Sequence, residues 1–225
     1  MRPYRALFLD IDDTVLDYAQ CGGQALAETC RRMGAVCTEE IAARFWAIDA
    51  RVWAQQKRGA WTIDQVLDRR AKEMADLLGM PEKAGLFRSG FVEALGRTAV
   101  PVAGAAALLD RLRARGMPVY GASNGFLATQ QRRLRLAGLL DRFAGLYVSD
   151  DIGAEKPDPV FFRRALARAG RDAAEVLMVG DSYHADVLGG SAAGLDTCWF
   201  CRGAADRPPV WTYLVRSLEE LDALL

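Results

Sequence analysis

The sequence predicts an α/β protein in which a doubly wound parallel sheet carries a bundle of helices inserted after its first strand. Strand and helix patterns alternate from about Val100 to the end of the chain, which is typical of a parallel sheet covered by helices on both faces. Between about Tyr18 and about Leu95, apolar residues instead recur every three or four positions, and no strand pattern interrupts them. One short apolar run precedes this helical region.

The first strand is that run, Ala6 to Leu9, and acidic residues follow it at once. The helical region contains the segments ARFWAIDARVWAQQ and VLDRRAKEMADLLG, with breaks at Gly34, Gly59 and the segment GMPE. The chain therefore leaves the sheet after one strand, forms helices, and returns. An insertion at this position would cover the carboxyl ends of the strands as a lid.

The remaining elements follow in order along the chain. After a helix in VPVAGAAALLDRLRARG, we expect strands in MPVYGAS, GLYVSD, EVLMVGD and DTCWF, and helices in FLATQQRRLRLAG, DPVFFRRALARAG, ADVLGGSAAG and LEELDALL. Pro159 in the first turn of one helix and Gly170 just past its end mark its boundaries.

Composition excludes several classes of protein. The 225 residues are 51% hydrophobic, and 29 basic residues balance 29 acidic ones. A formal net charge of zero gives no field that would attract a nucleic acid polymer or an anionic membrane surface. No apolar run approaches the roughly 20 residues of a membrane span, so we expect a cytoplasmic protein. Three arginine pairs are interpreted as solvated helix faces: Arg31–Arg32, Arg132–Arg133 and Arg163–Arg164.

The five cysteines do not form the framework of a secreted, disulfide-rich domain, because their number is odd and their positions are scattered. Cys198 and Cys201 form a C-x-x-C pattern. A redox pair needs its first cysteine at a helix N-terminus, whereas this pattern follows a strand into a loop. We expect these two residues to serve packing rather than redox chemistry.

Polar residues end four of the predicted strands. The first strand leads into Asp10, Asp12 and Thr14, and the other three strands lead into Ser123 and Asn124, into the loop with Lys156, and into Asp181 and Asp186. Carboxyl ends of parallel strands meet at one edge of a sheet, where open α/β sheets bind ligands. The sequence therefore predicts one site at this edge.

The chemistry that these groups suit is phosphoryl transfer. Mg²⁺ between Asp10 and Asp181 would allow clustered carboxylates to coexist, since hard cations prefer oxygen ligands. Asp10 could then attack phosphorus, while Asp12 protonates the leaving oxygen and later activates water. Ser123 and Thr14 could hold phosphoryl oxygens. Lys156, one of four lysines against 25 arginines, would add a compact positive charge.

The same residues carry a family resemblance. DIDDT, the SN pair, KPDP and GDSYHAD resemble the four motifs of the haloacid dehalogenase (HAD) superfamily. The resemblance implies a Rossmann-like core (1–16 and 97–225), a helical cap (17–96), and dependence on Mg²⁺. It also implies roles for the motif residues: Asp10 as nucleophile and metal ligand, Asp12 as acid/base with its carbonyl on the metal, Ser123 and Lys156 at the phosphate, Asp181 as metal ligand, and Asp186 ordering the water on the metal. Asn124 is grouped with the phosphate contacts, and Asp13, where many members have glycine, is expected to be peripheral.

A narrower resemblance points to a substrate. SNGFLATQQRRLRLAGL, GLDTCWF and LMVGDS are similar to the house-cleaning branch of nucleotidases, which implies action on pyrimidine nucleoside monophosphates. The rival substrates are another small metabolite such as phosphoglycolate or a sugar phosphate. A 2-haloacid dehalogenase is a weaker alternative, because members that cleave carbon–halogen bonds generally lack an aspartate at the Asp12 position. A monomer or homodimer is expected.

Two other classes fit less well. A phosphorylatable receiver domain also combines aspartates, a hydroxyl and a lysine, but receivers are about half as long and place the phosphorylated aspartate after the third strand. A catalytically silent binding protein is disfavoured because all four motifs are intact.

Aromatic residues of the cap could stack on a base, and Tyr18, Trp46, Trp53 and Trp61 are the candidates. Trp46 and Trp53 lie one heptad apart, so we expect them in the core of the bundle instead. Phe126, beside Ser123, is the aromatic residue expected to contact substrate. His184 is expected near the metal site or facing solvent, because Asp12 already supplies the acid/base.

Overall fold

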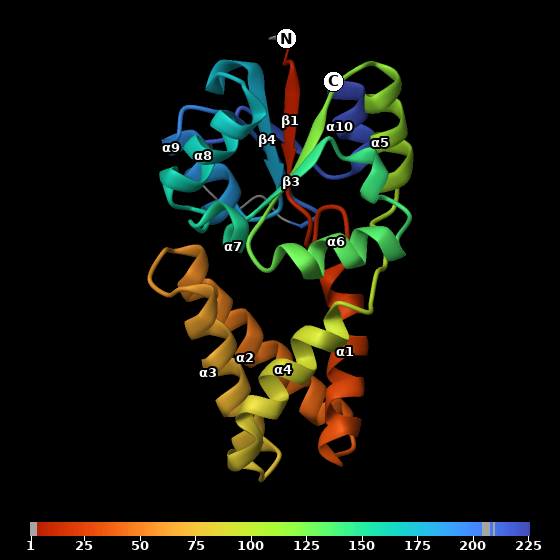
Figure 1. The fold of residues 1–225 in the computed structure, drawn as a ribbon, viewed down its shortest axis with the longest axis vertical. Coiled ribbons are helices and arrows are strands. Elements are labelled where there is room, and N and C mark those ends of the chain that lie inside the picture. Colours follow the sequence, from red (N-terminus) through yellow and green to blue (C-terminus); the bar gives the residue numbers. More distant parts are fainter. Residues whose placement is uncertain (1–3, 204–207, 209) are drawn as a thin grey trace.

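The computed structural model describes residues 4–203, 208 and 210–225. Its six strands form one parallel sheet in the order β3-β2-β1-β4-β5-β6 (Figure 1). The order runs outward in opposite directions from β1 and β4, which makes the crevice between these two strands the expected ligand site. The predicted doubly wound sheet is thus confirmed. The strands are β1 (Ala6–Leu9), β2 (Val119–Ser123), β3 (Gly145–Val148), β4 (Val176–Gly180), β5 (Asp196–Phe200) and β6 (Tyr213–Val215).

Both faces of the sheet are buried, because alternate residues of a strand point to opposite sides. In β1, Leu7 and Leu9 pack beneath α5 (Ala105–Ala114) and α10 (Leu218–Leu224), whereas Ala6 and Phe8 pack on the side of α8 (Pro159–Ala169). Figure 1 shows α8 and α9 (Gly189–Ala192) on one side of the sheet, and α5 and α10 on the other. Burial on both faces explains why this strand is apolar throughout.

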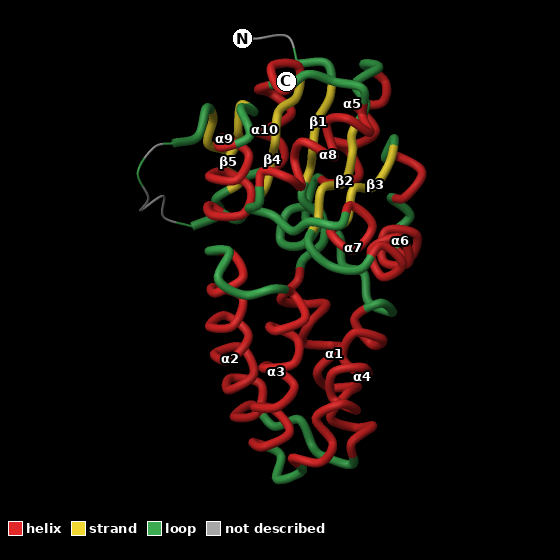
Figure 2. Tube along the Cα trace, turned by 60° about the vertical axis from the view of Figure 1, so that its left-hand side comes forward, coloured by secondary structure: helices red, strands yellow, loops and turns green. Residues whose placement is uncertain are grey.

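Four helices occupy the insertion: α1 (Tyr18–Met33), α2 (Glu39–Lys57), α3 (Ile63–Leu77) and α4 (Ala84–Leu95). They form a bundle beyond the carboxyl ends of the strands (Figures 1 and 2). The bundle has its own apolar core, which includes Phe45, Met74, Phe87 and Phe91. The division of the chain into a core of 1–16 and 97–225 and a cap of 17–96 stays a prediction.

Local signals set the helix ends. The Asp17 side chain accepts a hydrogen bond from the Gln20 N–H at the start of α1, and Gly34 ends this helix in the left-handed region with φ 80°. Helix α8 begins with Pro159 and is capped by Gly170 in the left-handed region, so its predicted boundaries are confirmed.

The structure differs from the sequence-based expectation at two places near the C-terminus. Residues 185–194 do not form the one regular helix that was expected: the π-helix η4 (Tyr183–Leu188) precedes the short α9. The edge strand β6 was missed, because three residues are too few to show an alternating pattern. The other described elements are α6 (Leu127–Leu136), α7 (Ser149–Ile152), and the 3-10 turns Pro81–Lys83, Leu140–Arg142 and Ala173–Glu175.

Within the part of the chain that the structure describes, no helix is long and apolar enough to cross a membrane. None of the five cysteines forms a disulfide among the described residues. Cys198 lies in β5, where burial raises the pKa of its thiol to about 12, so the reactive thiolate is scarce at neutral pH.

Candidate active site

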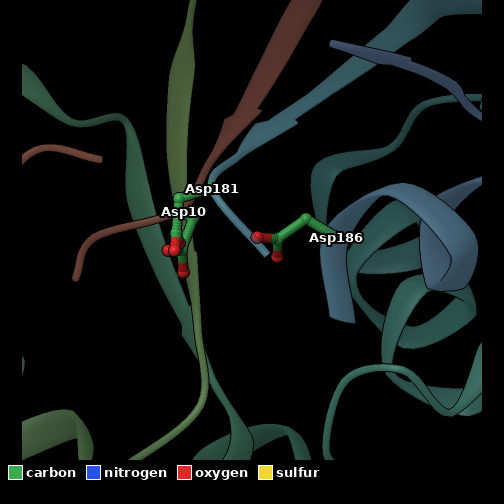
Figure 3. Close-up of side chains that lie close together, drawn as sticks. All are labelled: Asp10, Asp181 and Asp186. Atoms are coloured by element: carbon green, nitrogen blue, oxygen red, sulfur yellow. The ribbon is translucent and has the colours of Figure 1, made fainter. Parts of the chain in front are cut away.

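Three carboxylates meet where the two central strands end. Asp10 follows β1, Asp181 follows β4, and Asp186 lies in η4. One oxygen of each lies within 4.8 Å of one oxygen of each of the others. Figure 3 shows the Asp186 carboxylate directed toward the other two. The backbone N–H of Asp10 donates to the Val179 carbonyl at 2.9 Å, so the sheet itself fixes the position of Asp10.

Lys156 balances part of this negative charge. Its Nζ donates to Asp10 Oδ1 at 2.8 Å, to Asp186 Oδ1 at 2.6 Å and to the Ala122 carbonyl at 2.6 Å. Although burial lowers the pKa of Lys156, the two carboxylates raise it above its ordinary value. The ammonium group therefore remains charged in a side chain that is only 3% exposed.

Neighbouring residues hold Lys156 and Asp186 in place. The Asn124 side chain accepts from the Lys156 N–H and donates to the Lys156 carbonyl, both at 2.8 Å. Both polar groups of the amide are thus engaged by the Lys156 backbone. A Cβ on Gly180 would lie 2.2 Å from Asp186 Oδ2, so a side chain at this position would displace Asp186.

The cluster could hold a divalent cation. Burial raises the pKa of Asp10 well above its usual range despite the opposing effect of Lys156, and burial raises the pKa of Asp181 to about 6. Both pKa values are raised because these carboxylates are removed from water and lie close to other negative charges. A cation between them would stabilise the ionised forms. The donors are all carboxylate oxygens, which is the chemistry that Mg²⁺ prefers.

Two residues of α6 hold the carboxylate of Asp12. Arg133 Nη1 donates to Asp12 Oδ1 at 2.6 Å, and Gln130 Nε2 donates to Asp12 Oδ2 at 2.8 Å and to Ser123 Oγ at 3.0 Å. The Arg133 side chain is completely buried. The expectation that Arg132–Arg133 form a solvated helix face is therefore wrong for Arg133, because its charge is paired with Asp12 instead of hydrated.

Asp13 and Thr14, the next two residues of the motif, lie in different surroundings. Asp13 has φ 60°, in the left-handed region that favours glycine, and its Oδ1 accepts from the Tyr18 N–H at 3.1 Å. Thr14 is fully buried and does not line the cavity described below, and its Oγ1 has no hydrogen-bond partner among the described residues. The structure thus does not bring the predicted Thr14 hydroxyl to the site.

A cavity of about 580 Å³ lies between the carboxylates and the helical bundle. Asp10, Asp12, Ser123, Asn124, Lys156, Asp181 and Asp186 all line it. Phe126, at the N-terminus of α6, lines it as well, and so does the half-buried His184.

The bundle contributes the opposite wall. Trp46 and Trp53 are half-buried and line the cavity. The expectation that both belong to the bundle core is therefore wrong for Trp53. It is partly met by Trp46, which also packs against that core. Phe45 and Val52, one position earlier on α2, are the fully buried residues. The apolar stripe of this helix is therefore rotated by one residue relative to the expectation.

Lys57, at the end of α2, also lines the cavity, and sequence reasoning missed it. Burial lowers its pKa, but the field of Asp181, Asp186 and Asp10 raises it above the ordinary value. Its rarity, as one of four lysines, was the one signal that pointed to it. The bundle thus brings a positive charge to the carboxylate cluster.

A buried polar network supports the wall of the bundle. Arg70 Nη1 donates to Asp49 Oδ1 at 2.6 Å and to the Tyr18 hydroxyl at 3.1 Å. The Arg70 guanidinium lies 4.2 Å from the centre of the Phe91 ring. Arg70 and Asp49 are almost completely buried, and all three members of the network line the cavity.

Hydrogen bonds join the bundle to the loop of Lys156. Gln56 Nε2 donates to Glu155 Oε2 at 3.0 Å and to the Lys156 carbonyl at 2.9 Å. The N–H of Ile63, the first residue of α3, donates to Glu155 Oε1 at 2.9 Å. The acceptor carboxylate sits where the helix dipole favours negative charge.

Comparison with known proteins agrees with this arrangement. The family model for haloacid dehalogenase-like hydrolases matches residues 4–194. The chain is 32% identical to the HAD-hydrolase YfnB of Bacillus subtilis, over 100% of this chain and 97% of YfnB. It is 35% identical to the pyrimidine 5'-nucleotidase YjjG of Escherichia coli, over 97% of this chain and 96% of YjjG. The pyrimidine 5'-nucleotidase PynA of Streptococcus pneumoniae is 27% identical over 88% of this chain and 84% of its own length.

The structural comparison extends over both parts of the chain. The crystal structure of YfnB bound to magnesium superimposes with a TM-score of 0.92, covering 99% of this chain and 98% of that one. The family model spans all four polar strand ends, from Asp10 to Asp186. The resemblance found in the motifs is confirmed, and the chain belongs to the haloacid dehalogenase-like hydrolases.

Proposed function

We propose that this protein hydrolyses phosphate monoesters through a covalent intermediate on Asp10, with pyrimidine nucleoside 5'-monophosphates as its preferred substrates. The observation that carries this proposal is the cavity that Asp10, Asp12 and Lys156 line together with Trp46, Trp53 and Lys57 of the bundle. Its volume of about 580 Å³ lies within the range of small-molecule sites.

In the first step an Asp10 oxygen forms a bond to phosphorus as the bond to the leaving oxygen breaks, and Asp12 donates its proton to that oxygen. In the second step a water oxygen attacks the same phosphorus, the bond to Asp10 breaks, and the water proton passes to Asp12. Asp10 and Asp12 thus return to their starting states. Mg²⁺ held by Asp10 and Asp181 would supply positive charge where the anionic ester meets a carboxylate.

Other residues have supporting roles in this proposal. Lys156 and Ser123 bind the phosphoryl oxygens, and Asp186 keeps Lys156 oriented and would order the water on a bound metal ion. Asn124 holds the Lys156 loop through its two hydrogen bonds to the Lys156 backbone. Lys57 of the bundle adds a second positive charge near the phosphate.

Two observations support a nucleotide as the substrate. Trp46, Trp53 and Phe126 line the cavity and offer flat surfaces on which a base could stack, at about 1–3 kcal/mol per base. Two relatives similar over most of the chain are named pyrimidine 5'-nucleotidases.

The test is phosphate release, with and without Mg²⁺, from UMP, dUMP, dTMP, purine nucleotides, phosphoglycolate and hexose phosphates. Asp10→Asn is the control for the covalent step, and chloride release from 2-chloropropionate tests the dehalogenase alternative. We expect release from the pyrimidine nucleotides to be highest and to require both Mg²⁺ and Asp10. Preference for phosphoglycolate or a hexose phosphate would retain the mechanism and reject the substrate. Phosphate release that Asp10→Asn leaves intact would reject the mechanism.

A further inference from the structure

Asp12 is held at both of its carboxylate oxygens by side chains from one helix turn. Gln130 and Arg133 are three residues apart on α6, so they project from the same face of the helix. Arg133 bonds Oδ1 at 2.6 Å, Gln130 bonds Oδ2 at 2.8 Å, and Arg133 Nη1 also donates to Gln130 Oε1 at 3.0 Å. The two side chains therefore brace each other as well as the carboxylate.

Burial decides how Arg133 acts. Its side chain has no exposed surface although Arg133 belongs to the lining of the cavity, whereas the Asp12 side chain in the same lining is 29% exposed, so the accessible group of this pair is the Asp12 carboxylate. Arg133 Nε lies 3.4 Å from the Thr98 carbonyl, in the connection that returns from the bundle. Burying a guanidinium is costly unless its partners have good geometry, and those partners include Asp12.

We propose that Arg133 and Gln130 are positioning residues that fix the Asp12 carboxyl group in the orientation in which it gives and takes protons. Gln130 extends this control to the phosphate contacts, since it also donates to Ser123 Oγ at 3.0 Å. The inference rests on the proposed function, in which Asp12 is the acid/base. Without the two side chains, Asp12 would rotate freely, and a displacement of about 1 Å at a catalytic group costs on the order of 100-fold in rate.

A leaving-group comparison tests the inference. The first step with UMP requires Asp12 to protonate an alkoxide, whereas p-nitrophenolate leaves without a proton. Hydrolysis of the Asp10 intermediate requires Asp12 as base whichever ester was used. We expect Arg133→Met and Gln130→Leu to lower kcat/KM for UMP about 100-fold. With p-nitrophenyl phosphate, the same variants should release about one equivalent of p-nitrophenol per site in a fast burst and then turn over slowly.

Matched controls lie next to each position. Arg132→Met and Gln131→Leu remove the same side chains from exposed positions of α6 and should leave both substrates unaffected. Arg133→Lys keeps the charge without the planar fork and should restore part of the UMP activity. Melting temperatures verify folding, and Gln130→Leu, which removes no charge, tests the same contact if Arg133→Met does not fold.

The outcomes separate the two proposals. Equal losses in the burst rate and in UMP hydrolysis, or no loss in either, would overturn the positioning role while the wild-type protein remains an active phosphatase. A wild-type protein that hydrolyses neither ester, nor any other phosphate ester of the panel, would overturn the proposed function and the positioning role with it.

Discussion

Replacing Lys156 with methionine should convert the carboxylate cluster into one whose stability depends on a metal. The substitution keeps an unbranched side chain and removes the ammonium group that contacts Asp10 at 2.8 Å and Asp186 at 2.6 Å. Both carboxylates would then lie buried without their cation. Because Lys156 repels a divalent ion at the same carboxylates, its removal should also strengthen Mg²⁺ binding.

The magnitude follows from the geometry. At 2.8 Å and an effective dielectric constant of about 20, Coulomb's law gives roughly 6 kcal/mol of attraction for one pair. Desolvation offsets much of this, and removing one partner of a buried pair costs about 3–5 kcal/mol. We expect the free energy of unfolding without Mg²⁺ to fall by about that amount. Mg²⁺ at 100 times the Kd of the variant should restore about 2.7 kcal/mol, and the same concentration should stabilise the wild type by less, because its Kd is higher.

The assay is urea-induced unfolding in EDTA and in Mg²⁺, on the wild type, Lys156→Met and Lys72→Met. Lys72 is exposed on α3 and serves as the matched control. If Lys156→Met lowers the free energy of unfolding in EDTA by no more than Lys72→Met does, the assignment of Lys156 as the buried counter-charge is refuted. Equal gains from Mg²⁺ in the wild type and in Lys156→Met would place the ion elsewhere than at this cluster.

Three further predictions concern the metal, the substrate and the bundle. Burial raises the pKa of Asp181 to about 6, and only the ionised carboxylate binds metal. The Kd for Mg²⁺ measured by calorimetry should therefore rise as the pH falls below about 6, and a Kd independent of pH would contradict this. Lys57→Met should raise KM for the phosphate ester about 10- to 100-fold, which is the range expected for the loss of a hydrogen bond to a charged group, and should change kcat less. An unchanged KM would show that Lys57 does not contact the substrate. Arg70→Met leaves Asp49 buried without its partner and should lower the free energy of unfolding by about 3–5 kcal/mol. Arg69 is exposed, so Arg69→Met should change the free energy of unfolding by less than about 1 kcal/mol. Similar decreases in the two variants would show that the buried pair contributes little.

The sequence predicts the sheet and the residues at its edge because both follow from short-range patterns. Asp10 and Asp181 are each the residue after an apolar strand, and parallel pairing of β1 with β4 brings those ends together. The position of Asp186 is likewise predictable, since it lies five residues beyond Asp181 in the same motif. For these residues, local position along a strand determines position in the site.

The contacts of α6 could not be predicted in this way. Arg133 contacts Asp12 across 121 positions of the chain, and no sequence motif distinguishes it from its neighbour Arg132. A weak signal exists in retrospect: Gln130 and Arg133 share a helix face with the buried Leu134, and polar residues on an apolar face require partners. The orientation of α2 had a similar ambiguity, because Phe45 and Val52 show the same heptad spacing as Trp46 and Trp53.

The hydrogen bonds from Gln56 and Ile63 to the Glu155–Lys156 segment affect how often the bundle can separate from the sheet domain during a catalytic cycle. Each such hydrogen bond contributes about 0.5–1.5 kcal/mol, so the set holds the bundle against the loop by roughly 2–4 kcal/mol. With a tenfold population ratio for every 1.4 kcal/mol, these bonds alone leave on the order of one molecule in a hundred open at any moment. Domain motions of this kind occur in microseconds to milliseconds, whereas a typical enzyme turns over about ten times per second. Entry of water and exit of product would then be fast events within each catalytic cycle, and the bonds around Glu155 are weak enough to break many times before one ester is hydrolysed.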